Sequence, residues 1–195
     1  VSARLLREHV ISEVQDSPSD IFEQIGRMMP THTAVNCWHM NDHESAAMWK
    51  LYSPEGEGVA IRTTFGDLKD SISASEEDVF IGMVRYLDYE SAVDAGVVTN
   101  ILTPFLRKRI SFQHEHELRA IVARMPVKEG GSLDLSAEPL PEGVQVPVNL
   151  ELLVHEVRVS PTAQTWYLEV VQAIADRFEV RCQVNQSDLA KAPYW

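Results

Sequence analysis

The segment FQHEHELRAIVAR (Phe112–Arg124) begins with histidines and glutamates and ends as an apolar run. If it forms a β-strand, its side chains alternate between the two faces of a sheet. Glu115, Glu117 and Arg119 then share one face. We therefore predict a strand that enters the core and exposes these three side chains to a cleft at its beginning.

The charged residues of this strand allow two interpretations. A carboxylate at a strand end can stabilise an oxocarbenium ion, the species formed when a glycosidic bond of a sugar or of NAD is cleaved. Glu117 and Glu115 would then be catalytic, and Arg119 would bind substrate because a guanidinium group holds phosphate. Alternatively, the three side chains form a ladder of surface charges worth about a few tenths of a kcal/mol.

The other patterns along the chain mix strands and helices. Strand-like alternation occurs at 33–40, 58–65, 79–89, 155–161 and 180–189. Helix-like patterns occur at 5–29, 43–53, 67–73, 99–112 and 162–178. Because no regular βαβα rhythm appears, we predict an α+β fold with a mixed, partly antiparallel sheet flanked by helices. We expect an N-terminal helical segment over 1–30 and one domain over 31–195, with a turn-rich loop at about 125–148.

Composition limits the classes of function. The 195 residues are 45% hydrophobic and 24% charged, as in an ordinary globular protein. The formal net charge of -12 makes nucleic acid an unlikely partner, whereas a small molecule or a protein remains compatible. No apolar run reaches the roughly 18 residues that span a bilayer, and Cys37 and Cys182 form no disulfide framework. We therefore expect a cytoplasmic protein without membrane contact.

A second polar cluster lies in the stretch CWHMNDHESAAMWKLYSPEGEGVAI. We predict that this stretch forms the other wall of the cleft. Its proposed substrate-binding residues are His39, Glu44, Trp49 and Tyr52. The simpler interpretation is that Ser45 caps the following helix and that the tryptophans belong to the core.

Metal-assisted hydrolysis is a third hypothesis for the same stretch. His39 and His43 stand four residues apart, the spacing of zinc ligands on a helix. The strand-like residues before them and the pair Asn41-Asp42 disfavour a continuous helix there, and a third ligand would have to come from elsewhere. We therefore assign no metal ligands.

Three stretches in a fixed order resemble a bacterial protein family. They are CWHMNDHESAAMWKLYSPEGEGVAIRTTF, KRISFQHEHELRAIV, and LLVHEVRVSPTAQTWYLEVVQAI followed by NQSDL. Together they are similar to family 2971 of the domains of unknown function, over about 35–195. The resemblance implies a mixed α/β domain in a bacterial cytoplasm and supplies no activity. The N-terminal stretch usual in that family is not recognised in Val1–Pro30, so a site shared with it would be incomplete here.

A looser similarity of layout concerns ADP-ribosyltransferase-like toxins. A strand with Glu-x-Glu, a turn-rich loop, a strand ending Val-x-Val-Ser and a final helix resemble the C-terminal half of some of these toxins. The likeness implies that Glu117 is the catalytic carboxylate, that Glu115 orients the acceptor, and that NAD is the substrate. It is a likeness of arrangement, and arrangement does not establish function.

Two hypotheses of function follow. In the first, the chain is a transferase or glycohydrolase-like enzyme that acts on NAD or another nucleotide through Glu117. In the second, it is a non-catalytic ligand- or partner-binding regulatory domain of a bacterial stress or phage-defence system. Geometry discriminates between them: an open, aromatic-walled pocket around Glu115 and Glu117 would favour the enzyme, and a pair closed off by cations would favour a structural role.

Overall fold

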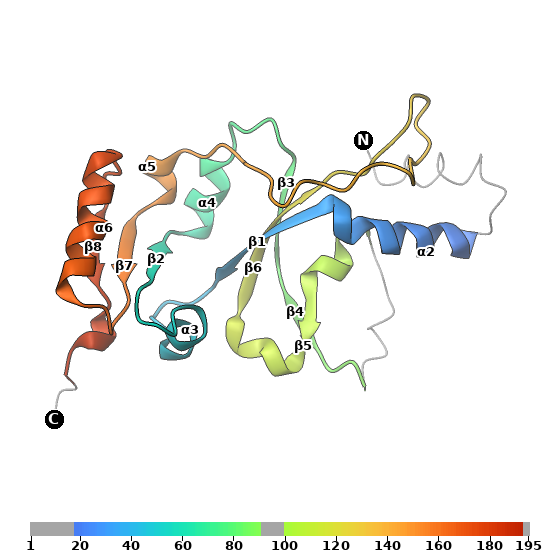
Figure 1. Ribbon diagram of the computed structural model, residues 1–195. Coiled ribbons are helices and arrows are strands. Elements are labelled where there is room, and N and C mark those ends of the chain that lie inside the picture. Colours follow the sequence, from blue (N-terminus) through green and yellow to red (C-terminus); the bar gives the residue numbers. More distant parts are fainter. Residues whose placement is uncertain (1–17, 91–99, 193–195) are drawn as a thin grey trace. The chain divides into compact units, whose positions relative to one another are not determined.

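The computed structural model describes residues 18–90 and 100–192 (Figure 1). The chain divides into two compact units. Unit 1 comprises Val1–His39 and Glu77–Gln145, and unit 2 comprises Met40–Glu76 and Val146–Trp195. The predicted domain over 31–195 spans both units, and its boundaries stay a prediction.

In the described residues, unit 1 contains one α-helix, three 3-10 helices and two sheets. Its elements are α2 (Pro18–Met28), η1 (Met29–His32), β1 (Thr33–His39), β3 (Val79–Met83), β4 (Arg85–Leu87), η3 (Thr103–Leu106), β5 (Arg107–Arg109), η4 (Ile110–Glu115) and β6 (Glu117–Ala123). β6 lies between β1 and β3 and pairs antiparallel with both. β4 and β5 form a separate parallel pair.

β6 carries the core of unit 1. Ile121 is fully buried, and Leu118 and Val122 are nearly so. Burial of such side chains, at about 1.5–3 kcal/mol each, is the main driving force for forming this sheet. The pairing places Cys37, Arg119 and Gly82 in one row across the three strands.

Unit 2 is built on a three-stranded sheet. Its elements are α3 (Ala46–Tyr52), β2 (Val59–Arg62), α4 (Phe65–Ser71), α5 (Leu150–Leu153), β7 (Glu156–Val159), α6 (Thr165–Arg177), β8 (Gln183–Gln186) and η5 (Asp188–Ala190). β7 pairs antiparallel with β2 and parallel with β8. α6 runs beside β7 and β8 (Figure 1).

Side-chain caps begin the short helices of unit 2. Ser45 accepts a hydrogen bond from the backbone N–H of Met48 before α3, as the sequence predicted. Thr64 accepts one from Asp67 N before α4, and Asn149 caps α5. Each cap satisfies amide groups that the first helical turn leaves without partners, which is typically worth about 1 kcal/mol.

The α+β class with a mixed, partly antiparallel pairing of strands is confirmed. The predicted strand over 79–89 instead divides at Val84, so β3 and β4 belong to different sheets. The predicted helix over 99–112 is wrong. Residues 107–109 pair with β4, which leaves only the single 3-10 turn of η3 before them. Pro104 lies in the first turn of η3.

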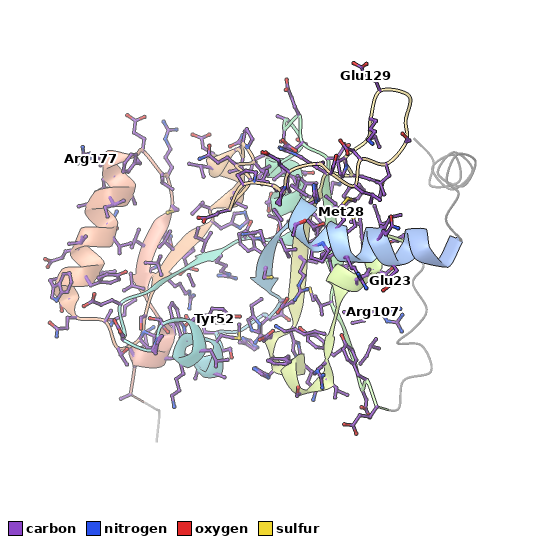
Figure 2. The ribbon with its side chains drawn as sticks, turned by 45° about the vertical axis from the view of Figure 1, so that its right-hand side comes forward. Glu23, Met28, Tyr52, Arg107, Glu129 and Arg177 are labelled. Atoms are coloured by element: carbon purple, nitrogen blue, oxygen red, sulfur yellow. The ribbon has the colours of Figure 1, made fainter. Side chains whose placement is uncertain are left out.

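The opening segment is a strand only in its second half. Residues 110–115 form the 3-10 helix η4, and His116 adopts a left-handed conformation with φ of 41°. β6 therefore starts at Glu117. Residues 125–148 form no helix or strand apart from one bridge between Val127 and Leu133, and Glu129 lies at the tip of this loop (Figure 2). None of the described helices is both long and apolar enough to cross a bilayer.

Candidate functional site

Two glutamates and two cations form a closed cluster in unit 1, defined here as the Lys108 cluster. Lys108 on β5 places its ammonium group 2.7 Å from Glu117 Oε1 and also pairs with Glu115 Oε2. Arg119 Nε donates to Glu117 Oε2 over 2.6 Å. Both carboxylate oxygens of Glu117 thus have a cationic partner.

The exposure predicted for these glutamates is wrong. Glu115 is 7% exposed and Glu117 only 4%. The reason is that η3 lies over this face of the sheet: a Cβ added to Gly82 would come within 2.8 Å of Leu106 Cδ1. Phe105 O also accepts a 2.6 Å hydrogen bond from Arg119 Nη1.

The backbone around His116 brings the two glutamates to the same cation. In a continuous strand they would share a face by alternation, but the left-handed turn at His116 ends η4 and starts β6. The backbone N–H of Glu117 donates to the hydroxyl of Tyr86 over 2.8 Å, and its carbonyl accepts from Val84 N. These two bonds fix the first residue of β6.

The electrostatic balance keeps Glu117 and Lys108 charged. Burial raises the pKa of Glu117, but hydrogen bonding with Glu115, Arg119 and Lys108 outweighs it and lowers the pKa to about 2. Burial lowers the pKa of Lys108, and its bonds to the two glutamates reverse this, so the net shift is upward. At neutral pH neither side chain exchanges a proton readily.

His39 is the one residue of the second predicted wall that lies at this cluster. Its Nδ1 lies 2.6 Å from the carbonyl oxygen of Glu115, and because a carbonyl only accepts, Nδ1 carries the proton. Nε2 is buried and has no hydrogen-bond partner among the described residues. The ring of His116 lies edge-on at 6.3 Å between centroids.

Glu44, Trp49 and Tyr52 belong to unit 2. Glu44 accepts hydrogen bonds from the indole of Trp49 and the backbone N–H of Asp188, each at 3.3 Å, and it also binds Ser187 and Arg158. Its carboxylate therefore ties the segment before α3 to β7 and η5. Tyr52 ends α3 and is largely exposed (Figure 2). The substrate-binding roles of these three residues stay predictions.

The sequence reasoning missed Lys108, Tyr86 and Arg158. The sequence did contain a pattern that indicates Arg158, because Glu-x-Arg occurs on two predicted strands. Arg158 Nε donates to Glu156 Oε1 over 3.0 Å, just as Arg119 does to Glu117. Lys108 had no such signal, since its partners follow seven and nine residues later, on the far side of most of the 3-10 helix η4.

In 18–90 and 100–192, no three His, Cys, Asp or Glu side chains are grouped as metal ligands would be. An open hollow of about 630 Å³ in unit 2 is lined by residues that include His155, Asp176, Glu179 and Cys182. None of the predicted site residues lines it.

Comparisons with protein-family models, curated proteins and solved structures find no match for this chain. The resemblances to family 2971 and to ADP-ribosyltransferase-like toxins therefore stay predictions.

Proposed function

We propose that the chain is a non-catalytic, partner-binding domain and that the Lys108 cluster has a structural role. The observation that carries this proposal is that Lys108 and Arg119 occupy both carboxylate oxygens of Glu117 in a buried setting. To act as a nucleophile or to stabilise an oxocarbenium ion, a carboxylate must lie beside the reacting carbon. Glu117 could do so only by leaving both cations, and breaking a buried pair typically costs about 3–5 kcal/mol.

The protonation states support the same conclusion. A general acid or base works best when its pKa lies near the operating pH, and the pKa of Glu117 is about 2. The upward pKa shift of Lys108 keeps that amine protonated and therefore non-nucleophilic at neutral pH.

Binding is supported by the exposed face of α6 in unit 2. This face carries several large apolar side chains in a regular row, among them Trp166 and Ile174. Rows of this kind on a surface are typical of contacts with another macromolecule.

One observation favours the enzyme as a second candidate. An oxocarbenium ion is stabilised by an ionised carboxylate, and Glu117 is ionised at neutral pH. Lys108 is 25% exposed at the edge of the cluster, where a phosphate group of NAD could compete for it.

Calorimetric titration with NAD and ADP-ribose, together with an assay of nicotinamide release, separates the two candidates. We expect no saturable heat and no nicotinamide from the native chain, and a less stable but equally inactive Glu117→Gln variant. Glu129→Gln, an exposed carboxylate on a loop tip, is the matched control. Nicotinamide release that disappears in a folded Glu117→Gln variant and persists in the control would establish the enzyme instead.

A further inference from the structure

We propose that a second copy of this chain docks on the exposed face of α6, with the two α6 helices antiparallel. The inference rests on the proposed partner-binding function and names the partner. Four apolar side chains spaced four residues apart form a row along α6 and the residue that follows it. Trp166 is 48% exposed, Val170 44%, Ile174 51% and Phe178 69%.

This row is not used by the core of unit 2. α6 contacts β7 and β8, and Ala175 on its other side is buried. Residues four apart form a ridge along a helix, and two such ridges interdigitate when helices cross at about -50°, the commonest packing class. The exposed row of α6 therefore has the spacing needed to pack against a second helix of the same kind.

Two charged residues beside this row favour an antiparallel orientation of the two α6 helices. Glu169, Ala173 and Arg177 form the neighbouring ridge, and all three are exposed. If the two-fold axis of the dimer passes through Ala173, Glu169 of each copy faces Arg177 of the other copy. The dimer then contains two such interchain ion pairs. A parallel arrangement would place like charges opposite each other. No ion pair to Glu169 or Arg177 is found within the described residues, and Arg177 lies at the end of α6 (Figure 2).

The sizes of the side chains also fit two α6 helices that cross at Ala173. Ala173 is small and lets the two backbones approach. Trp166 and Phe178 lie seven and five residues away, about 8–10 Å along the axis, where crossed helices diverge and large rings fill the space. Four apolar side chains per copy form less than a standard interface, so we expect a reversible dimer in the micromolar range.

Sedimentation velocity of the full chain over a range of micromolar concentrations tests this inference. We expect a monomer–dimer equilibrium that Ile174→Glu abolishes. Glu169→Arg or Arg177→Glu alone should weaken it about tenfold, because each removes both interchain pairs. The double variant Glu169→Arg/Arg177→Glu should restore it, which a general loss of folding could not do. Glu129→Arg makes a comparable charge change away from α6 and should leave the dimer unchanged.

A chain that stays monomeric throughout, or a dimer that none of the α6 substitutions weakens, would overturn the inference. Failure of the proposed function has a different signature. Nicotinamide release in the NAD assay would contradict the non-catalytic proposal whatever the sedimentation result, and a monomer without enzyme activity would overturn only the self-association.

Discussion

The ammonium group of Lys108 lies between the carboxylates of Glu115 and Glu117, and its distance to Glu117 Oε1 is 2.7 Å. One cation from β5 thus holds the end of η4 and the start of β6 together. Its removal would take this cation from both buried carboxylates and leave Glu117 paired with Arg119 alone.

Lys108→Met should destabilise unit 1 by about 3–5 kcal/mol, because a buried charge loses its partner. Urea unfolding and hydrogen exchange of the β6 amides measure this loss. Lys69→Met is the matched control: Lys69 forms an exposed pair with Asp70 at 3.7 Å, which is worth about 1 kcal/mol at most. Equal losses in the two variants would show that the cluster is not structural.

Acid should destabilise the chain through Glu117. Its pKa is about 2 in the folded chain, against an ordinary value of 4.5. The unfolded chain therefore binds the carboxyl proton of Glu117 more tightly than the folded chain does. The contribution of Glu117 to the free energy of unfolding is complete above the unfolded pKa of about 4.5, and it is lost as the pH falls through the folded pKa. The difference corresponds to about 3 kcal/mol. Urea midpoints of the native chain should fall over this range, and those of Glu117→Gln should fall less. Parallel curves would contradict the assignment.

Arg158→Met should destabilise unit 2 by a similar mechanism. Arg158 Nη1 pairs with Glu44 and lies 3.2 Å from Asp188 Oδ2, and Nε pairs with Glu156. We expect a loss of about 3–5 kcal/mol in the free energy of unfolding. Arg181→Met, which removes a longer and exposed contact to Glu151 at 3.9 Å, should cost less than about 1 kcal/mol. The prediction is wrong if thermal unfolding ranks the two variants equally.

Alanine substitutions at two glycines distinguish the cost of backbone strain from the cost of steric contact. Gly56 has φ of 82°, and a Cβ there would lie 2.7 Å from Thr162 Oγ1. Gly130 also has positive φ, at 105°, but no atom within 4 Å of the added Cβ. Gly130→Ala should therefore cost only the backbone strain, about 1 kcal/mol, and Gly56→Ala clearly more. Equal shifts in melting temperature would argue that contact with Thr162 adds nothing.

Local patterns identified most of the elements. The strand over 33–39, the cap at Ser45 and the helix at 165–177 follow from alternation, hydroxyl capping and apolar periodicity, all of which depend on residues close in the chain. The same local reasoning failed at 99–112. There the partner is β4, and the pairing of β5 with β4 competes successfully with helical propensity.

The sequence by itself determined which residues carry charge on one face of each strand, because side-chain alternation is a local property. Glu-x-Arg on β6 and on β7 are both examples. Only the tertiary structure decided that Glu117 is buried, since η3 and β5 fold over its face and bring Lys108 to it. Glu44 likewise meets Ser187 and Asp188 across more than 140 residues of chain. Such contacts depend on sheet register and long-range packing, which no local pattern encodes.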